Sequence, residues 1–311
     1  MRQAPRVVPL AIFAVLAAIP ILREAGVPLG GFVPLVAGRI TIFAIAAMSL
    51  DFILGVGGLA SFGHAAPLAI GAYAMAMLDA AGIHDALMVV PVAMLAAGAF
   101  ALATGAIALR TTGINFLMIT LAFAQMVYFA AGSLADYGGD DGYSLDACIN
   151  LAGWKLAGRG GLYGLSLGVL FVVWLLFRML TESHFGRTLS AARQNRVRVE
   201  AMGIDVFAVE LTALVIAAMV CAIAGVLLAN EAEFVSPAYA AWGRSGSLMV
   251  MVLLGGAGSL HGAILGAAVV VMFEEGLGRL TPHWPLIFGP LLVLAVLFLR
   301  RGIAGIGGRD A

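Results

Sequence analysis

Asp51 is the residue with the clearest chemical interest, because it lies near the middle of the apolar run Ile40–Leu59. An ionised carboxylate is costly inside a bilayer, so an acid at such a position is a functional candidate by default. Arg39 cannot be its partner within one helix, because twelve residues at 1.5 Å each place them about 18 Å apart. Asp51 therefore either belongs to a solute path or has a structural role, capping broken backbone near Gly55 or bonding a neighbouring helix.

Two glycine-rich segments, 53–64 and 255–262, interrupt apolar runs at comparable places in the two halves of the chain. Matched interruptions of this kind point to an internal repeat whose broken helices line a solute path at mid-membrane. The freed backbone is tolerable only where it is buried in protein or faces water. The alternative is that each glycine serves helix packing. The path candidates from these segments are Gly55, Gly57, His64, Gly255, Gly256 and His261.

The remaining polar candidates form no recognisable ligand set. His64 and His261 either respond to protons or contact solute, or they cap the helix breaks, the commoner role of such a histidine. Thr120 and Gln125 are further path candidates, although five residues turn a helix by about 140° and so place them on different faces. The five histidines show no i, i+4 pair and no Cys/His spacing, so the sequence predicts no metal site.

The sequence argues against catalysis in this chain. Its one lysine, Lys155, stands in Gly153-Trp154-Lys155-Leu156, so the lysine that a phosphate-binding P-loop requires is missing. There is no Gly-x-Ser-x-Gly nucleophile motif and no carboxylate pair. We therefore expect no enzyme activity and no cofactor, with any ATP bound by partner subunits. An intramembrane enzyme is the weakest reading.

The composition predicts an integral membrane protein. Of 311 residues, 62% are hydrophobic and 11% are charged, against about 25% charged in globular proteins. Seventeen basic and seventeen acidic residues balance, and no basic tract would follow a phosphate backbone, so nucleic acid is not an expected partner. Cys148 and Cys221 fall in a loop and an apolar run, so no disulfide framework is indicated.

We expect an all-α polytopic fold with about 8–10 transmembrane helices, including glycine-broken helical hairpins. A crossing needs roughly 20 apolar residues. One domain, 1–311, is expected, with pseudo-repeated halves 1–160 and 161–311. The candidate apolar runs are Val7–Leu22, Ile40–Leu59, Ala65–Leu78, Met88–Leu109, Ile114–Leu134, Leu162–Met179, Val209–Ala229, Leu248–Phe273 and Trp284–Leu299.

Arginines set the expected orientation, since basic residues of short loops stay on the cytoplasmic side. Five arginines gather in or next to the loop 180–208, which we place inside. The acidic loop 135–161 then lies outside. Keeping the C-terminal arginines inside requires Leu248–Phe273 to be a hairpin of two short helices. The residues that carry this assignment are Arg178, Arg187, Arg193, Arg196, Arg198, Arg300, Arg301 and Arg309 inside, with Asp136, Asp140, Asp141 and Asp146 outside.

The inside loop predicts a short amphipathic helix. Phe185, Leu189 and Ala192 share one face at helical spacing, and Arg196 breaks the pattern, so the helix should end before it. Such a helix lies on the bilayer or in a groove of another protein. The alternative is a positive-inside loop without a partner.

Several blocks, in order, resemble the larger of the two permease types of bacterial ABC importers for branched-chain amino acids. The resemblance covers most of the chain. The blocks are Leu50–Ala66 with Ile70–Tyr73, Thr111–Ile114 with Thr120–Gln125, Gly138–Gly142, Phe185–Arg187 with Ala201–Ile204, Val235–Pro237 and Leu253–Gly262.

This resemblance implies a multi-pass protein of the bacterial inner membrane that pairs with a paralogous permease, two cytoplasmic ATPase subunits and a periplasmic solute-binding protein. It implies that the inside loop docks on the ATPase, with Glu200-Ala201-Met202-Gly203 as a reduced coupling motif, and that loop 135–161 meets the binding protein. The coupling candidates are Phe185, Gly186, Arg187, Arg193, Glu200 and Gly203.

Two alternatives remain open for the function. Members of the family also move urea, short amides and other small carboxylates, and the pore residues do not separate these solutes. A stand-alone secondary transporter, driven by protons through Asp51 and the histidines, is the other reading.

Overall fold

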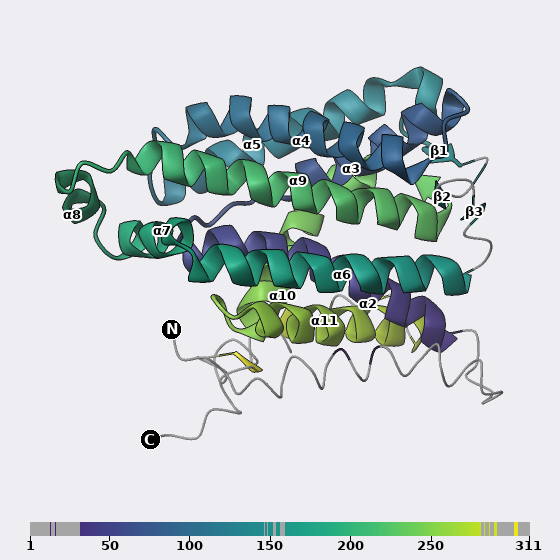
Figure 1. The fold of residues 1–311 in the computed structure, drawn as a ribbon. Helices are drawn as coiled ribbons and strands as arrows, with labels where there is room; N and C mark the ends of the chain where they lie inside the picture. Colours follow the sequence, from purple (N-terminus) through teal and green to yellow (C-terminus); the bar gives the residue numbers. More distant parts are fainter. Residues whose placement is uncertain are drawn as a thin grey trace.

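The chain is a bundle of helices in which strands are few and short (Figure 1). The computed structural model describes residues 32–280 except 146, 148, 152–153 and 156–158, together with Phe13, Leu16, His283, Leu286, Gly289, Pro290, Gly302 and Ile303. The expected all-α class is confirmed. The expected spans Val7–Leu22 and Trp284–Leu299 lie almost wholly outside the described residues, as do Cys148, Asp146 and the arginines of the C-terminus.

Ten helices are described between residues 32 and 280. They are α2 (Phe32–Asp51), α3 (Ala65–Ala80), α4 (Ala86–Ala108), α5 (Ile114–Ser133), α6 (Arg159–Glu182), α7 (His184–Gln194), α8 (Arg196–Ala201), α9 (Val206–Ala232), α10 (Trp242–Gly255) and α11 (Leu260–Leu280). Shorter turns are the π-helical η1 (Phe52–Val56) and the 3-10 turns η2 (Ala135–Tyr137) and η3 (Pro237–Ala240).

Four two-residue strands form two small antiparallel pairs. β1 (Tyr143–Ser144) pairs with β4 (Phe234–Val235), with Tyr143 opposite Val235. β2 (Asn150–Leu151) pairs with β3 (Trp154–Lys155). These strands lie together at one end of the bundle, and α7 and α8 lie at the other end (Figure 1). The arginine-rich loop and the acidic loop therefore occupy opposite ends, as the orientation rule requires.

Six of the described helical segments are long and apolar enough to cross a membrane: Val33–Val56, Ala86–Ala108, Ile114–Ser133, Gly161–Glu182, Val206–Ala232 and Leu260–Arg279. The expected hairpin over Leu248–Phe273 is present, because α10 and α11 pack side by side and Gly266 lies against the Met251 carbonyl. Only α10 is short, however: α11 has 21 residues and is long enough to cross a membrane. α3 is apolar but has only 16 residues, about 24 Å of helix, so it starts inside the bundle.

The core is built around α2 and α9. α9 packs against α2, α3, α4 and α6, and α2 also packs against α10 and α11. Both helices are mostly buried, whereas α4, α5 and α6 are mostly exposed and apolar along their outer faces. Leu95, Phe129 and Val172, for example, are each more than 60% exposed, as expected of side chains that face lipid.

α2 begins eight residues before the apolar run and ends at Asp51. Asp51 therefore lies in the last third of the span Val33–Val56 and not near its middle. The sequence prediction was wrong here because the apolar run was counted only from Ile40, the residue after Arg39. In the structure Arg39 lies inside α2, bonded to Glu231 at 3.3 Å and to Glu275. This charge is tolerated within the helix because α9 and α11 each supply a carboxylate.

Small residues let α3 and α9 approach closely. A Cβ on Gly71 would overlap the Ala222 backbone, and one on Gly225 would overlap the Leu68 carbonyl. Glycine on both helices is the packing device expected where lipid supplies no hydrophobic driving force between helices. Glycine is a packing residue at this contact, which lies outside the two glycine-rich segments.

We predict that Gly225→Leu prevents α3 from packing on α9 and destabilises the protein by about 2 kcal/mol or more, because the side chain must displace helix backbone. The measurement is thermal unfolding in detergent by circular dichroism. The matched control is Gly164→Leu, since a Cβ on the exposed Gly164 meets nothing within 4 Å. Equal unfolding temperatures for the two variants would contradict the prediction.

Candidate functional site

The first glycine-rich segment breaks the helix that starts as α2. Beyond Asp51 the chain continues as the π-helical turn η1, and residues 57–64 then run back into the bundle to the start of α3. The Leu59 amide donates to the Ile53 carbonyl at 2.9 Å, so it does not make the usual helical bond to Gly55. π-helical turns of this kind frequently occur at functional sites.

The second segment separates α10 from α11. Gly256 (φ 108°) and Gly258 (φ 88°) have positive φ angles, which glycine adopts without a steric penalty. The Ser259 hydroxyl donates to the Gly256 carbonyl at 2.8 Å, and α11 begins at the next residue. A Cβ on Gly255 would overlap Gly262, so the two arms of the hairpin meet closely beside the break.

The two breaks contact each other through Asp51. Its Oδ1 accepts the Gly258 amide at 2.6 Å, and a Cβ on Gly55 would overlap Gly258. Asp51 is 1% exposed, and its Oδ2 has no hydrogen-bond partner among the described residues. Of the roles that the sequence left open for Asp51, the structure supplies the structural one, a bond to a neighbouring hairpin. A role in a solute path stays a prediction.

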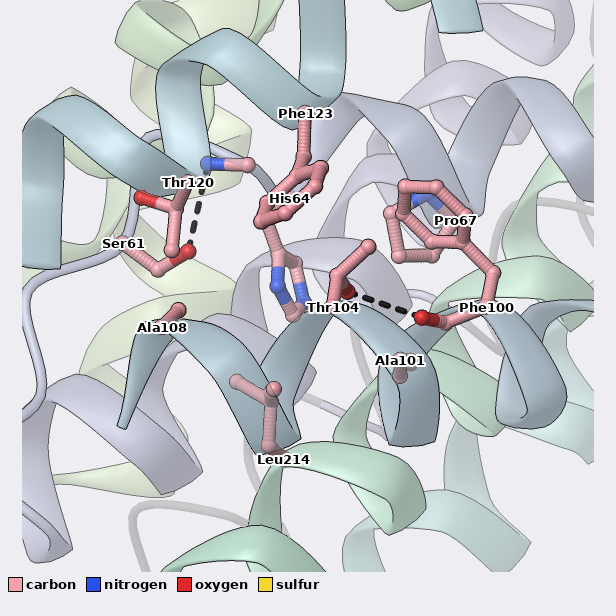
Figure 2. A pocket seen from close by; sticks show the side chains of 13 residues that line it. Ser61, His64, Pro67, Phe100, Ala101, Thr104, Ala108, Thr120, Phe123 and Leu214 are labelled. Carbon is pink, nitrogen blue, oxygen red and sulfur yellow. Dashed lines mark hydrogen bonds between the residues drawn. The ribbon is translucent and has the colours of Figure 1, made fainter. Parts of the chain in front are cut away.

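His64 and Thr120 belong to a second place, a small cavity between α3, α4, α5 and α9 (Figure 2). His64 Nε2 lies 2.8 Å from the Ser49 hydroxyl, and Thr120 accepts the Phe62 amide at 3.2 Å. The cavity has about 30 Å³, room for one or two waters and far below the roughly 300 Å³ of a typical small-molecule pocket. In this conformation it does not hold an amino-acid-sized solute.

The expectation that a histidine at a helix break caps the helix is not met by His64. It occupies the N-cap position of α3 but makes no side-chain capping bond. The free amide of Ala65 instead donates to the Ser245 hydroxyl at 3.0 Å, which leaves the imidazole to bond Ser49. A side chain of α10 therefore accepts the first backbone amide of α3, and His64 connects the start of α3 to α2.

The other path candidates lie apart from these two places or at their margins. Gly57 lies against Leu189 of α7, and His261 is half-buried in the first turn of α11. Gln125 is half-buried on α5, with its Nε2 buried and without a partner in the described structure. The structure thus gathers Asp51, Gly55, Gly255 and Gly256 at the contact of the breaks, and His64 and Thr120 at the cavity.

The loop 180–208 forms two helices that carry a groove. α7 ends at Gln194, as Arg196 predicted, and buries Leu189 and Ala192 as expected. Ser183 and Asn195 cap α7 and α8 by accepting the Gly186 and Arg198 amides. The groove has about 290 Å³ and is lined by Thr181, Gly186, Arg187, Ser190, Ala191, Gln194, Asn195, Arg198, Val199 and Met202.

The coupling candidates have distinct positions in this hairpin. Phe185 stacks on Phe52 of η1 with centroids 6.4 Å apart, and a Cβ on Gly186 would overlap the end of α6. Arg187 is exposed at the groove, and Arg193 donates to the Gly55 carbonyl. Gly203 ends α8 at φ 81°, a left-handed conformation that favours glycine.

Arg196 holds α8 to α9 by bonding Glu200 at 2.9 Å and Glu210 at 3.1 Å. The side-chain bond to Glu200 is the main cause that raises the pKa of Arg196, so its charge is constant over physiological pH. Sequence reasoning missed this pairing because Glu210 lies fourteen residues away, inside the next apolar run. The candidate Glu200 therefore orients Arg196 within the hairpin.

The opposite end has an organised acidic surface. Asp79, at the end of α3, accepts the Tyr143 hydroxyl and the Ala147 amide, each at 3.3 Å, and lies 3.1 Å from His84 Nδ1. These bonds tie loop 135–161 to the bundle, while Asp136, Asp140 and Asp141 stay exposed. No group of three or more His, Cys, Asp or Glu side chains in the described residues could hold a metal ion.

A family model for the permease component of the branched-chain amino acid transport system matches residues 34–299. The chain belongs to this family. One curated relative is the high-affinity branched-chain amino acid transport system permease protein LivM of Escherichia coli K12. The chain is 28% identical to it over 84% of this chain and 67% of the relative. No solved structure matches significantly.

Two further relatives extend the comparison. The probable branched-chain amino acid transport permease protein LivM of Methanocaldococcus jannaschii is 26% identical over 84% of this chain and 90% of its own. The high-affinity permease protein LivH of Salmonella typhimurium is 24% identical over 85% and 91%. Family membership, with six apolar helices of spanning length among the described residues, makes this permease a multi-pass inner-membrane protein.

We predict that Arg196→Ala lowers the free energy of unfolding by about 1–3 kcal/mol, because it leaves the buried Glu210 carboxylate without its partner. Denaturant unfolding in detergent measures the effect. Arg198→Ala is the control, since that arginine is exposed on the same helix. The double variant Arg196→Ala with Glu210→Gln should recover part of the loss, and no difference between Arg196→Ala and its control would refute the role.

Proposed function

We propose that the chain is the permease subunit of an ABC importer that carries branched-chain amino acids across the inner membrane with a paralogous permease. Two separate ATPase subunits power it, and a periplasmic binding protein delivers the solute. Relatives named as LivM and LivH branched-chain permeases support this class. The observation that carries the proposal is the grooved α7–α8 hairpin, which touches the first helix break.

The hairpin has the features of a site through which a soluble partner drives a membrane protein. It projects from the end of the bundle (Figure 1) and carries exposed arginines at the groove. Val197 and Met202 on and beside α8 are 74% and 63% exposed. Exposed apolar residues next to a polar, charged groove are the arrangement found at protein interfaces. We assign this surface to the ATPase subunits, which supply the ATP site that the chain lacks.

The surface for the binding protein is assigned to the opposite end. Asp136, Asp140 and Asp141 are exposed there on a loop that β1 and β4 hold in place. An acidic surface attracts a basic one and steers its approach. We therefore expect basic residues on the facing surface of the binding protein.

The solute path is assigned to the region of the two breaks and to the interface with the paralogous permease. The cavity of about 30 Å³ is too small for an amino acid in this conformation, and we assign the remainder of the path to the interface with the second permease subunit. The path candidates Asp51, His64, Thr120, Gln125 and His261, with the glycines of the breaks, remain proposals for its lining. Lipid covers the apolar faces of α4 and α6.

Reconstitution tests the proposal directly. The five-part assembly in liposomes should take up radiolabelled leucine only with ATP inside and binding protein outside. Urea, a short amide and a small carboxylate, each offered with its own binding protein, test the alternative solutes. Uptake by the purified chain alone, driven by a proton gradient, would overturn the proposal in favour of a secondary transporter.

We predict that Arg187→Glu lowers leucine uptake about tenfold or more and abolishes stimulation of the ATPase by the loaded binding protein. The substitution reverses the charge beside the groove while α7 keeps its buried face. ATP hydrolysis and uptake are measured in the same liposomes.

Arg110→Glu is the matched control for this charge reversal. Arg110 is exposed between α4 and α5 and lies outside the groove. Normal stimulation and uptake by Arg187→Glu would show that partner docking does not use this surface. Equal losses in both variants would show that the effect is a general one of charge.

A further inference from the structure

Within the α7–α8 hairpin, α7 contacts the first break, and it does so along one face. Phe185 stacks on Phe52, and Leu189 lies 3.3 Å from where a Cβ on Gly57 would be. Leu189 is fully buried. α7 is thus packed on the turn η1, so a shift of α7 displaces the residues that follow Asp51.

A bond to Arg193 adds a polar connection to this packing. In a continuous α-helix the Gly55 carbonyl would accept the amide of Leu59, but that amide bonds Ile53 instead. The Gly55 carbonyl accepts the Arg193 guanidinium. The aliphatic part of Arg193 lies over Gly58, where any Cβ would meet it. The widened turn therefore provides the acceptor for a side chain from α7.

Residues at this turn also contact the second break. Asp51, four residues before Gly55, accepts the Gly258 amide, and Gly55 and Gly258 are in backbone contact. Arg193, Gly55, Asp51 and Gly258 thus form a continuous series from α7 to the α10–α11 hairpin.

We propose that this series is a mechanical linkage in which Arg193 is the positioning residue that transmits movement of α7 to both helix breaks. The proposal rests on the proposed function, in which α7 receives the movement from an ATPase. Through Arg193 the hairpin sets the position of Gly55, and through Asp51 the position of Gly55 sets that of Gly258. A shift at the surface of the bundle then moves two hairpins together, and neither glycine break moves alone.

Hydrogen exchange tests the linkage without reference to transport. In the purified assembly, Arg193→Ala should raise amide exchange about three- to tenfold in peptides covering 53–62 and also in peptides covering 254–262, which Arg193 does not bond. Asp51→Ala should raise exchange in 254–262. Arg193→Lys, which keeps a charged donor, should lie between Arg193→Ala and the unsubstituted protein.

The matched control is Arg110→Ala, which should leave both peptides unchanged, because Arg110 is exposed and makes no side-chain hydrogen bond to either break in the described structure. Circular dichroism of each variant establishes that the bundle is folded. Unchanged exchange at 254–262 in folded Arg193→Ala would overturn the linkage, whatever happens to uptake. A rise confined to 53–62 would likewise overturn it, since it would leave Arg193 with a purely local role.

The second experiment measures transport. Arg193→Ala should lower leucine uptake per ATP hydrolysed about tenfold relative to the unsubstituted assembly, because movement of the partner reaches the breaks poorly. Arg193→Lys should recover part of the ratio. An unchanged ratio in Arg193→Ala would contradict a transmitting role.

The two arms separate failure of this inference from failure of the proposed function. If the unsubstituted assembly shows no ATP-driven uptake, the proposed function fails and the exchange experiment still decides the linkage. If uptake is normal in the unsubstituted assembly and exchange at 254–262 does not respond to Arg193→Ala, the linkage alone fails.

Discussion

The constraint on which the structure depends is that a helix broken inside a membrane must find other partners for its freed backbone groups. This protein meets the constraint by pairing its two breaks. The carboxylate of Asp51 accepts a backbone amide of the second break, and the carbonyl of Gly55 accepts an arginine from α7. Each break is therefore stabilised by groups from elsewhere in the chain, and the position of one determines the position of the other.

Charged side chains inside the bundle are stabilised in a similar way, by groups from other helices. Arg39 is neutralised by two glutamates from α9 and α11, and Glu210 by an arginine from α8. The pairs of Arg39 join helices that are far apart in the sequence, whereas the pair of Arg196 and Glu210 joins the neighbouring helices α8 and α9. Removing one partner leaves a charge in a poorly solvated place, which costs more than the pair itself contributes. Polar groups here fix the mutual positions of helices that apolar packing alone leaves free to slide.

Composition and periodicity predicted much of the fold, because a membrane imposes a simple length rule on apolar runs. The two breaks were predictable from clustered glycines, and the end of α7 from Arg196. The start of α2 was not, because Arg39 interrupts hydrophobicity without interrupting the helix. The partners of Arg39 lie 192 and 236 residues away, and one sequence contains no signal for such pairings.

The candidate site was predicted as a set of residues but not as an arrangement. Asp51 and both glycine clusters were identified, whereas their mutual contact depends on how α10 and α11 pack on α2. His64 was expected to cap a helix, and Ser245 of a distant helix took the amide instead. Both arrangements depend on hydrogen bonds between residues that are far apart in the chain, and the local spacing of residues does not predict such bonds.

The bond between Asp51 and Gly258 joins a side chain to a main-chain amide, and this asymmetry limits how the protein can be retuned. A pair of side chains can be exchanged, reversed in charge or resized on either side. Here only the acceptor is adjustable, because the donor is fixed by a backbone that turns at a positive φ angle. An engineer who wants a looser or tighter connection between the two hairpins therefore has one position to vary, and every variant at Gly258 also changes the shape of the turn.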